Sequence, residues 1–246
     1  MTGRVLPAGL VALGLGLAGP LGLPAGAGFA ANAAQASPDA LAASASATLI
    51  DAAYRTAGEA AAMRKLEAAL ADAEAALTVR PDHQEARMQR ALALAYRSKL
   101  TRDRDDARAA RETFRAMVTE RPRDARAWAA LGSWHGEAVT NMGKFLAGSM
   151  LGAKTDSALE AFRRALLIAP NDPVIRTMYA INAIGLKQQD SPAEIRALLQ
   201  PVVRSSGGGP LAEIMRANAR TLLAVIDDPD ALRRNAYDMR PFDRFV

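Results

Sequence analysis

We predict that the chain folds as an all-α protein made of repeated helix pairs, on three observations. Half of its 246 residues are hydrophobic but only 5% are aromatic, so alanine, leucine and arginine dominate. Alanine costs no side-chain entropy in a helix and lets helix backbones approach each other. No stretch alternates the β-branched and aromatic residues that strands favour, and proline-ended segments of similar pattern recur along the chain. A chain of this length can bury the core of one or two domains.

The first 36 residues have the three parts of a secretory signal peptide. Arg4 precedes an uncharged stretch rich in leucine, glycine and alanine, and the segment ANAAQA contains two A-x-A cleavage patterns, which end at Ala33 and Ala36. Inner-membrane anchorage by an uncleaved leader is the alternative, because the apolar run approaches the length that spans a bilayer. Its prolines and glycines disfavour such a helix. We therefore expect removal of residues 1–36, export to the periplasm and no stable membrane insertion afterwards.

The amino-acid composition limits the kinds of binding site that the protein can have. The chain has no cysteine, which excludes disulfides, thiolate metal sites and a lipid anchor on a thiol. Its net charge of +5 is modest, and stretches such as RDRDDARAARETFR (residues 102–115) interleave basic with acidic side chains. That pattern is typical of a solvated helix face rather than a nucleic-acid site, so we expect no nucleic-acid partner.

The clearest repeat unit lies between Pro122 and Pro170. Its second half, ALEAFRRALLIAP, reads A-x3-F-x2-A-x4-P, and its first half, ARAWAALGSWH, contains W-x2-L-G with His135 where the pattern places tyrosine. Earlier segments that end at Pro81 and Pro122 align with it less completely. The residues that define the repeat are Trp128, Leu131, Gly132, Ala158, Phe162, Ala165 and Pro170.

This pattern resembles the tetratricopeptide repeat (TPR), a helix-turn-helix unit of about 34 residues that stacks into a solenoid. The likeness covers residues 47–200. It implies that Gly132 and Ala158 lie between the two helices of one unit, and that Trp128 and Phe162 fill the seam to the next unit. The proline ends the second helix because it cannot continue the hydrogen-bond ladder.

The units are longer than the TPR period. Pro81, Pro122 and Pro170 are 41 and 48 residues apart, so we expect the extra residues between paired helices, near 96–103 and 140–155.

A fourth, less regular pair follows, with Asp172 as cap and Pro173 in the first turn of its first helix, and Ser191-Pro192 opening its second. From Pro210 to about Ile226 we predict one C-terminal capping helix.

The predicted organisation is therefore a signal peptide, a linker over 37–46, a TPR-like α-solenoid of about four helix pairs over 47–226, and a C-terminal tail over 227–246 without periodicity.

In the third pair, GSMLGAKT (148–155) is one residue from a phosphate-binding loop, since an alanine replaces its second glycine. LLAVIDD (222–228) also imitates a strand that ends in a magnesium-binding aspartate. Such a loop joins a strand to a helix, whereas both segments lie in predicted helical surroundings. We expect no nucleotide and no other cofactor.

The sequence gives equally little support for a set of catalytic residues. The only histidines, His83 and His135, lack a second histidine at helical ligand spacing, and no G-x-S-x-G element is present. Paired carboxylates such as Asp105 and Asp106 are typical of a solvated face at this charge density. We therefore predict a protein that is not an enzyme and binds no metal.

The resemblance implies a partner site on the concave face, which the first helix of each unit lines. The side chains that the register places there are small or apolar, and the lysine and asparagine clamp of chaperone-binding TPR proteins is missing. Three occupants are open: residues 140–155 of the chain itself, an amphipathic helix of a partner protein, or a small ligand. The candidate groove residues are Met88, Leu92, Ala129, Ser133, Val174, Thr177, Ile181 and Ile184.

Two functions follow from these occupants. The first is a non-catalytic periplasmic scaffold that binds an unidentified protein partner in its groove. The alternative is a ligand-binding accessory subunit of an envelope transporter, which a closed pocket under residues 140–155 would favour.

Overall fold

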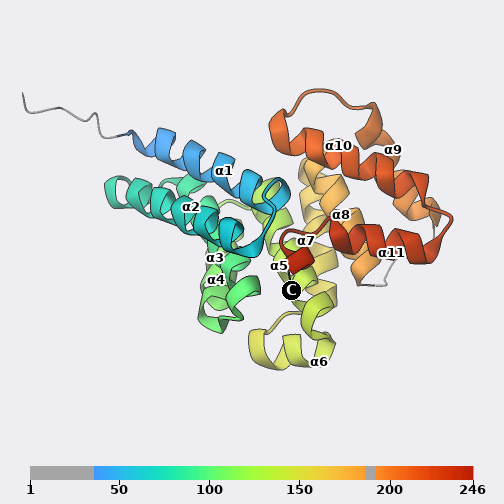
Figure 1. Cartoon of the computed structure of the whole chain (residues 1–246), viewed down its shortest axis with the longest axis horizontal. Helices are drawn as coiled ribbons and strands as arrows, with labels where there is room; N and C mark the ends of the chain where they lie inside the picture. Colours follow the sequence, from blue (N-terminus) through green and yellow to red (C-terminus); the bar gives the residue numbers. More distant parts are fainter. Residues whose placement is uncertain (1–35, 187–191, 246) are drawn as a thin grey trace, which may run out of the picture. The chain divides into compact units, whose positions relative to one another are not determined.

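The computed structural model describes residues 36–186 and 192–245, which are helical with no strand in either range (Figure 1). The predicted all-α class is therefore confirmed, while the leader up to Gln35 lies outside the described residues. The elements are α1 (Pro38–Tyr54), α2 (Glu59–Val79), α3 (Gln84–Thr101), α4 (Arg104–Glu120), α5 (Ala125–Met142), α6 (Lys144–Leu146), the π-helical turn η1 (Ala147–Leu151), α7 (Thr155–Ile168), α8 (Pro173–Gly185), α9 (Pro192–Arg204), α10 (Gly209–Ala224), α11 (Pro229–Asp238) and the 3₁₀ turn η2 (Asp243–Phe245).

The helices form a helical-repeat solenoid of four pairs, namely α1 with α2, α3 with α4, α5 with α7 and α8 with α9. Each second helix also packs on the first helix of the next pair, and the first helices α1, α3, α5 and α8 pack on one another in that order. Each pair thus buries a face of its neighbour, as a one-dimensional stack requires. At the C-terminal end α10 packs on α8 and α9, and α11 packs on α8 and α10.

The two helices of the third pair, α5 and α7, make their close contact at a glycine. A Cβ atom on Gly132 of α5 would lie 3.2 Å from the carbonyl oxygen of Ala158 in α7, so the backbones touch where the side chains are smallest. Phe162 is fully buried beside Gly132 and stacks on Tyr179 of α8, with ring centroids 5.2 Å apart and planes within 8°. One ring therefore links the third pair to the fourth. Trp128 is only half-buried, and its indole nitrogen donates to the carbonyl of Pro122 at 2.9 Å.

Aspartate side chains begin several helices. Asp172 accepts hydrogen bonds from the backbone nitrogens of Val174 and Ile175 at 2.8 and 3.0 Å, with Pro173 in the first turn of α8. This start is the one that the sequence predicts. Such a cap satisfies backbone donors that have no partner inside the helix.

The predicted linker over 37–46 is instead the first half of α1. Ser37 caps this helix by accepting from the backbone nitrogen of Ala40 at 3.1 Å, and a proline follows the cap. Ala42 and Ala45 are buried, so the small side chains of this stretch pack rather than remain in a solvated linker.

The second unit is lengthened in a different way from the one expected, whereas the extra residues of the third unit lie between its paired helices, as expected. In the second pair α3 continues to Thr101, and only Arg102 and Asp103 separate it from α4, so residues 96–103 lengthen a helix instead of a loop. In the third pair α5 reaches Met142, after which α6 and η1 lead into α7.

The predicted tail over 227–246 contains α11 and η2, so the described part of it is mostly helical. Asp228 begins α11 by accepting from the backbone nitrogens of Asp230 and Ala231 at 3.0 and 2.9 Å. The predicted capping helix is therefore present as α10, and a further helix, α11, lies where a tail was expected.

Candidate functional site

The predicted groove residues lie on the first helices of three pairs, but most are covered. Leu92 and Val174 are half-buried, while Thr177 is fully buried and its hydroxyl lies 3.4 Å from the carbonyl of Met215 in α10. These side chains therefore pack against neighbouring elements and offer little free surface. The remaining members are buried: Met88, Ala129, Ser133, Ile181 and Ile184.

The chain's own C-terminal segment covers the C-terminal ends of α3 and α5 (Figure 1). Phe242 is fully buried, and its ring centroid lies 5.2 Å from that of Tyr96 in α3. Arg240 donates to the side-chain oxygen of Asn141 in α5 at 3.4 Å. We call residues 239–245 the C-terminal segment; it covers the ends of two first helices, whereas residues 140–155 are one of the three occupants that the sequence leaves open for the groove.

Four charged side chains meet where this segment lies on α3 and α5, two from the segment and two from the helices. Lys99 of α3 pairs with Glu137 of α5 at 2.9 Å, donates to the carbonyl of Pro241 and pairs with Asp243. Arg240 pairs with the other Asp243 carboxylate oxygen at 3.1 Å. The side chains of Lys99 and Glu137 are 11% and 13% exposed, and those of Arg240 and Asp243 are 4% and 1% exposed. Charges this deeply buried need partners, because removing them from water is costly.

Residues 140–155 lie elsewhere. Arg108 of α4 donates to the carbonyl of Met150 at 3.2 Å, and Arg111 donates to that of Leu151, so the turn η1 is held against α4. Leu151 is buried, whereas Phe145 is 83% exposed. Residues 140–155, which we call the insertion, therefore extend the α4 side of the stack.

His135 joins this insertion to α5. Its Nδ1 atom accepts from the backbone nitrogen of Lys154 at 3.2 Å, and its ring meets that of Trp134 edge-on. Burial, followed by the positive charge of Arg111, lowers the pKa of His135 from 6.5 to about 4. The residue is a neutral acceptor at neutral pH and orders the start of α7.

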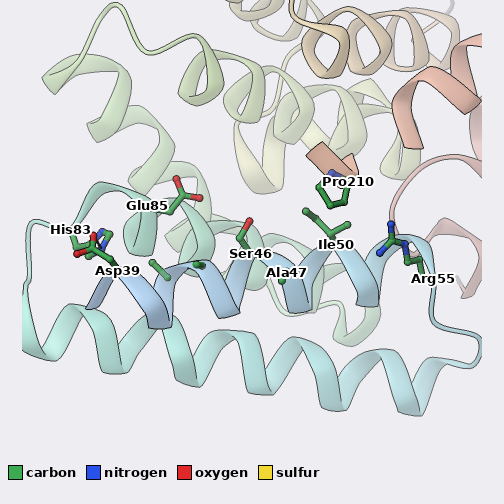
Figure 2. A pocket seen from close by; sticks show the side chains of 10 residues that line it. Asp39, Ser46, Ala47, Ile50, Arg55, His83, Glu85 and Pro210 are labelled. Atoms are coloured by element: carbon green, nitrogen blue, oxygen red, sulfur yellow. Dashed lines mark ion pairs between the residues drawn. The ribbon is translucent and has the colours of Figure 1, made fainter. Parts of the chain in front are cut away.

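An open cleft lies along α1 and has a volume of about 460 Å³ (Figure 2). Ile50 of α1 faces Pro210, in the first turn of α10, across it. Half of the lining residues are exposed, so the cleft is open to solvent. Its lining consists of Asp39, Ala42, Ala43, Ser46, Ala47, Ile50, Arg55, His83, Glu85 and Pro210.

The two ends of the cleft differ in charge. At one end Asp39 pairs with Arg80 at 2.7 Å and lies 3.2 Å from the Nε2 atom of His83. The hydrogen bond from Arg80 lowers the pKa of Asp39 below its usual value. Arg55 marks the other end, as Figure 2 shows. Between them the lining from α1 is small or apolar, at the spacing of one helix face.

The structure also bears on metal binding, nucleotide binding and membrane crossing. In the part of the chain that the structure describes, no three histidine or carboxylate side chains cluster in a way suited to a metal ion. Residues 148–151 belong to the helical turn η1 and Thr155 begins α7, so no strand leads into this segment, and Asp228 is a helix cap. Every helix in the described ranges is too short or too polar to cross a bilayer.

Comparison with known protein families, with curated proteins and with solved structures finds no match for the chain.

Sequence reasoning missed three residues of this architecture. Trp134, next to the predicted His135, is the buried tryptophan of the third pair, and its indole nitrogen donates to the carbonyl of Ala107 in α4 at 2.9 Å. Lys99 contacts Pro241 and Asp243, and Phe242 contacts Tyr96, across segments about 140 residues apart. The available signal was the pair of phenylalanines, Phe242 and Phe245, close to the end of the sequence.

Proposed function

We propose that the mature chain is a non-catalytic, TPR-like scaffold of the periplasm that holds a helical segment of a partner protein in the α1 cleft. The observation that carries this proposal is the row of small and apolar side chains along α1, which faces an open cleft while the opposite face of the helix packs on α2. Small side chains let a second helix approach to the usual interaxial distance of about 8–10 Å.

The openness of the cleft favours a protein partner over a small ligand. Ligand pockets bury most of their occupant, whereas Ala43, Ala47 and Pro210 on this cleft's lining are exposed. None of its lining residues comes from 140–155, the segment under which a pocket would have favoured the transporter subunit.

Ala47→Arg tests this proposal because it places a long charged side chain in the middle of the cleft. The mature protein, the variant and the matched control Ala68→Arg, at an exposed position of α2, are used as bait in envelope extracts. A protein captured by the wild type and by Ala68→Arg but lost with Ala47→Arg supports the cleft as the site. Identical captured sets for all three baits contradict it.

A further inference from the structure

The C-terminal segment and its seat each contain their own ion pair. On the seat, Lys99 of α3 and Glu137 of α5 pair at 2.9 Å, and within the segment Arg240 and Asp243 pair at 3.1 Å. Three polar contacts cross between the two: the ion pair between Lys99 and Asp243, the hydrogen bond from Lys99 to the Pro241 carbonyl, and the hydrogen bond from Arg240 to Asn141. When the C-terminal segment leaves α3 and α5, each of these four charges therefore keeps an opposite charge beside it, and water reaches both pairs.

The segment is also held in a costly conformation. Phe242 has a φ of +66°, in the left-handed region that residues with a Cβ atom rarely adopt. Such a conformation persists only where the surroundings enforce it, and here the burial of the ring beside Tyr96 does so. Release from the seat relieves this strain, which offsets part of the lost packing.

We propose that residues 239–245 form a displaceable latch on α3 and α5, and that a partner segment with a phenylalanine followed by an acidic residue takes the same seat. The seated segment itself defines this chemistry: a ring against Tyr96, and on the next residue a carboxylate for Lys99. No residue of this seat lines the α1 cleft, so the latch does not rest on the proposed function.

The probe is a fluorescein-labelled peptide of residues 236–246, AYDMRPFDRFV, added to full-length mature protein. Binding of the peptide is measured by fluorescence anisotropy for the wild type, for Phe242→Ala and for the control Phe145→Ala, whose ring is 83% exposed. The resident segment lowers the apparent affinity of the wild type by the fraction of molecules in which the seat is open. We expect Phe242→Ala to bind the peptide at least about tenfold more tightly than the wild type and Phe145→Ala to match the wild type.

Two further measurements place the peptide in the seat. Adding Lys99→Met to Phe242→Ala should abolish the gain in affinity for the peptide. A peptide with alanine in place of its first phenylalanine should not bind. Equal affinity of the wild type and Phe242→Ala for the peptide overturns the proposal, as does a gain that survives Lys99→Met.

Hydrogen exchange on the wild-type chain keeps the proposal testable if Phe242→Ala does not fold. Excess peptide should speed exchange of the backbone amides of residues 239–245 and leave those of α1 unchanged. An unchanged exchange rate in the C-terminal segment overturns the latch.

Discussion

Gly132 of α5 lies so close to Phe162 of α7 that a Cβ atom on the glycine would come within 3.0 Å of the phenylalanine ring. The contact joins two motifs that lie 30 residues apart in the sequence, the W-x2-L-G of the first helix and the A-x3-F of the second. With Ala158 on the same seam, the third pair has no room for a larger side chain.

Ala158→Leu should therefore destabilise the protein. Ala158 is fully buried, and extra methylene groups in a packed seam cost about 1–3 kcal/mol. The free energy of unfolding from urea titration measures this, with Ala75→Leu at an exposed position of α2 as the matched control. If both variants unfold at the same urea concentration, the seam is not close-packed.

This seam shows what the sequence could predict. The spacing of Gly132, Ala158 and Phe162 encodes a local helix hairpin, and such contacts repeat with a period that is visible in the chain. The cap at Asp172 with Pro173 behind it is equally local, because capping depends on neighbours two or three residues away.

The role of the C-terminal segment could not be predicted in the same way. Phe242 meets Tyr96, and Lys99 meets Asp243, through tertiary contacts that leave no periodicity in either stretch. The extent of α3 differs from expectation for another reason: the repeat length predicts a connection over residues 96–103, although no proline or glycine in that stretch would break a helix. Extra residues can lengthen a helix as readily as a connection.

His135 predicts a pH dependence of stability. Because burial lowers its pKa to about 4 in the folded protein, from 6.5 in the unfolded chain, the unfolded state binds more protons between these values. Its contribution is fully present above pH 6.5 and is lost as the pH falls toward 4. The shift corresponds to about 3 kcal/mol.

His135→Asn keeps an acceptor for the Lys154 backbone nitrogen but does not titrate. Urea unfolding of both proteins between pH 4.5 and 7.5 should show a smaller gain in stability with rising pH for the variant. Parallel profiles would mean that His135 does not stay neutral in the fold.

The insertion predicts a ranking of three substitutions. Leu151→Ser should lower the free energy of unfolding by about 1.5–3 kcal/mol, because it removes a buried side chain of this size. Phe145→Ser and Lys154→Ala, at exposed positions, should change it by less than about 0.5 kcal/mol. Titration with ATP and magnesium checks the alternative for GSMLGAKT, since saturable binding that Lys154→Ala abolishes would contradict our interpretation.

Export is predicted from the leader, which lies outside the described residues. N-terminal sequencing of the protein made in its host should begin near Ala34 or Ser37. Membrane-bound protein that retains Met1 would instead indicate an uncleaved anchor.

Lys99 should be the most sensitive position of the buried ion-pair cluster. Lys99→Met leaves Glu137 without its partner at a site that is 13% exposed, and loss of one member of a buried pair typically costs at least about 3 kcal/mol. Adding Glu137→Gln should recover part of this loss, because it removes the unpaired charge while Asp243 keeps its pairing with Arg240.

Urea unfolding of the two single variants and the double variant measures this coupling as a thermodynamic cycle. Lys65→Met is the matched control, since Lys65 and its partner Asp51 have side chains about 40% exposed and an exposed pair contributes at most about 1 kcal/mol. Strict additivity of Lys99→Met and Glu137→Gln would show that the two side chains do not interact. A loss for Lys99→Met no larger than that for Lys65→Met would show that the C-terminal segment leaves Lys99 in water.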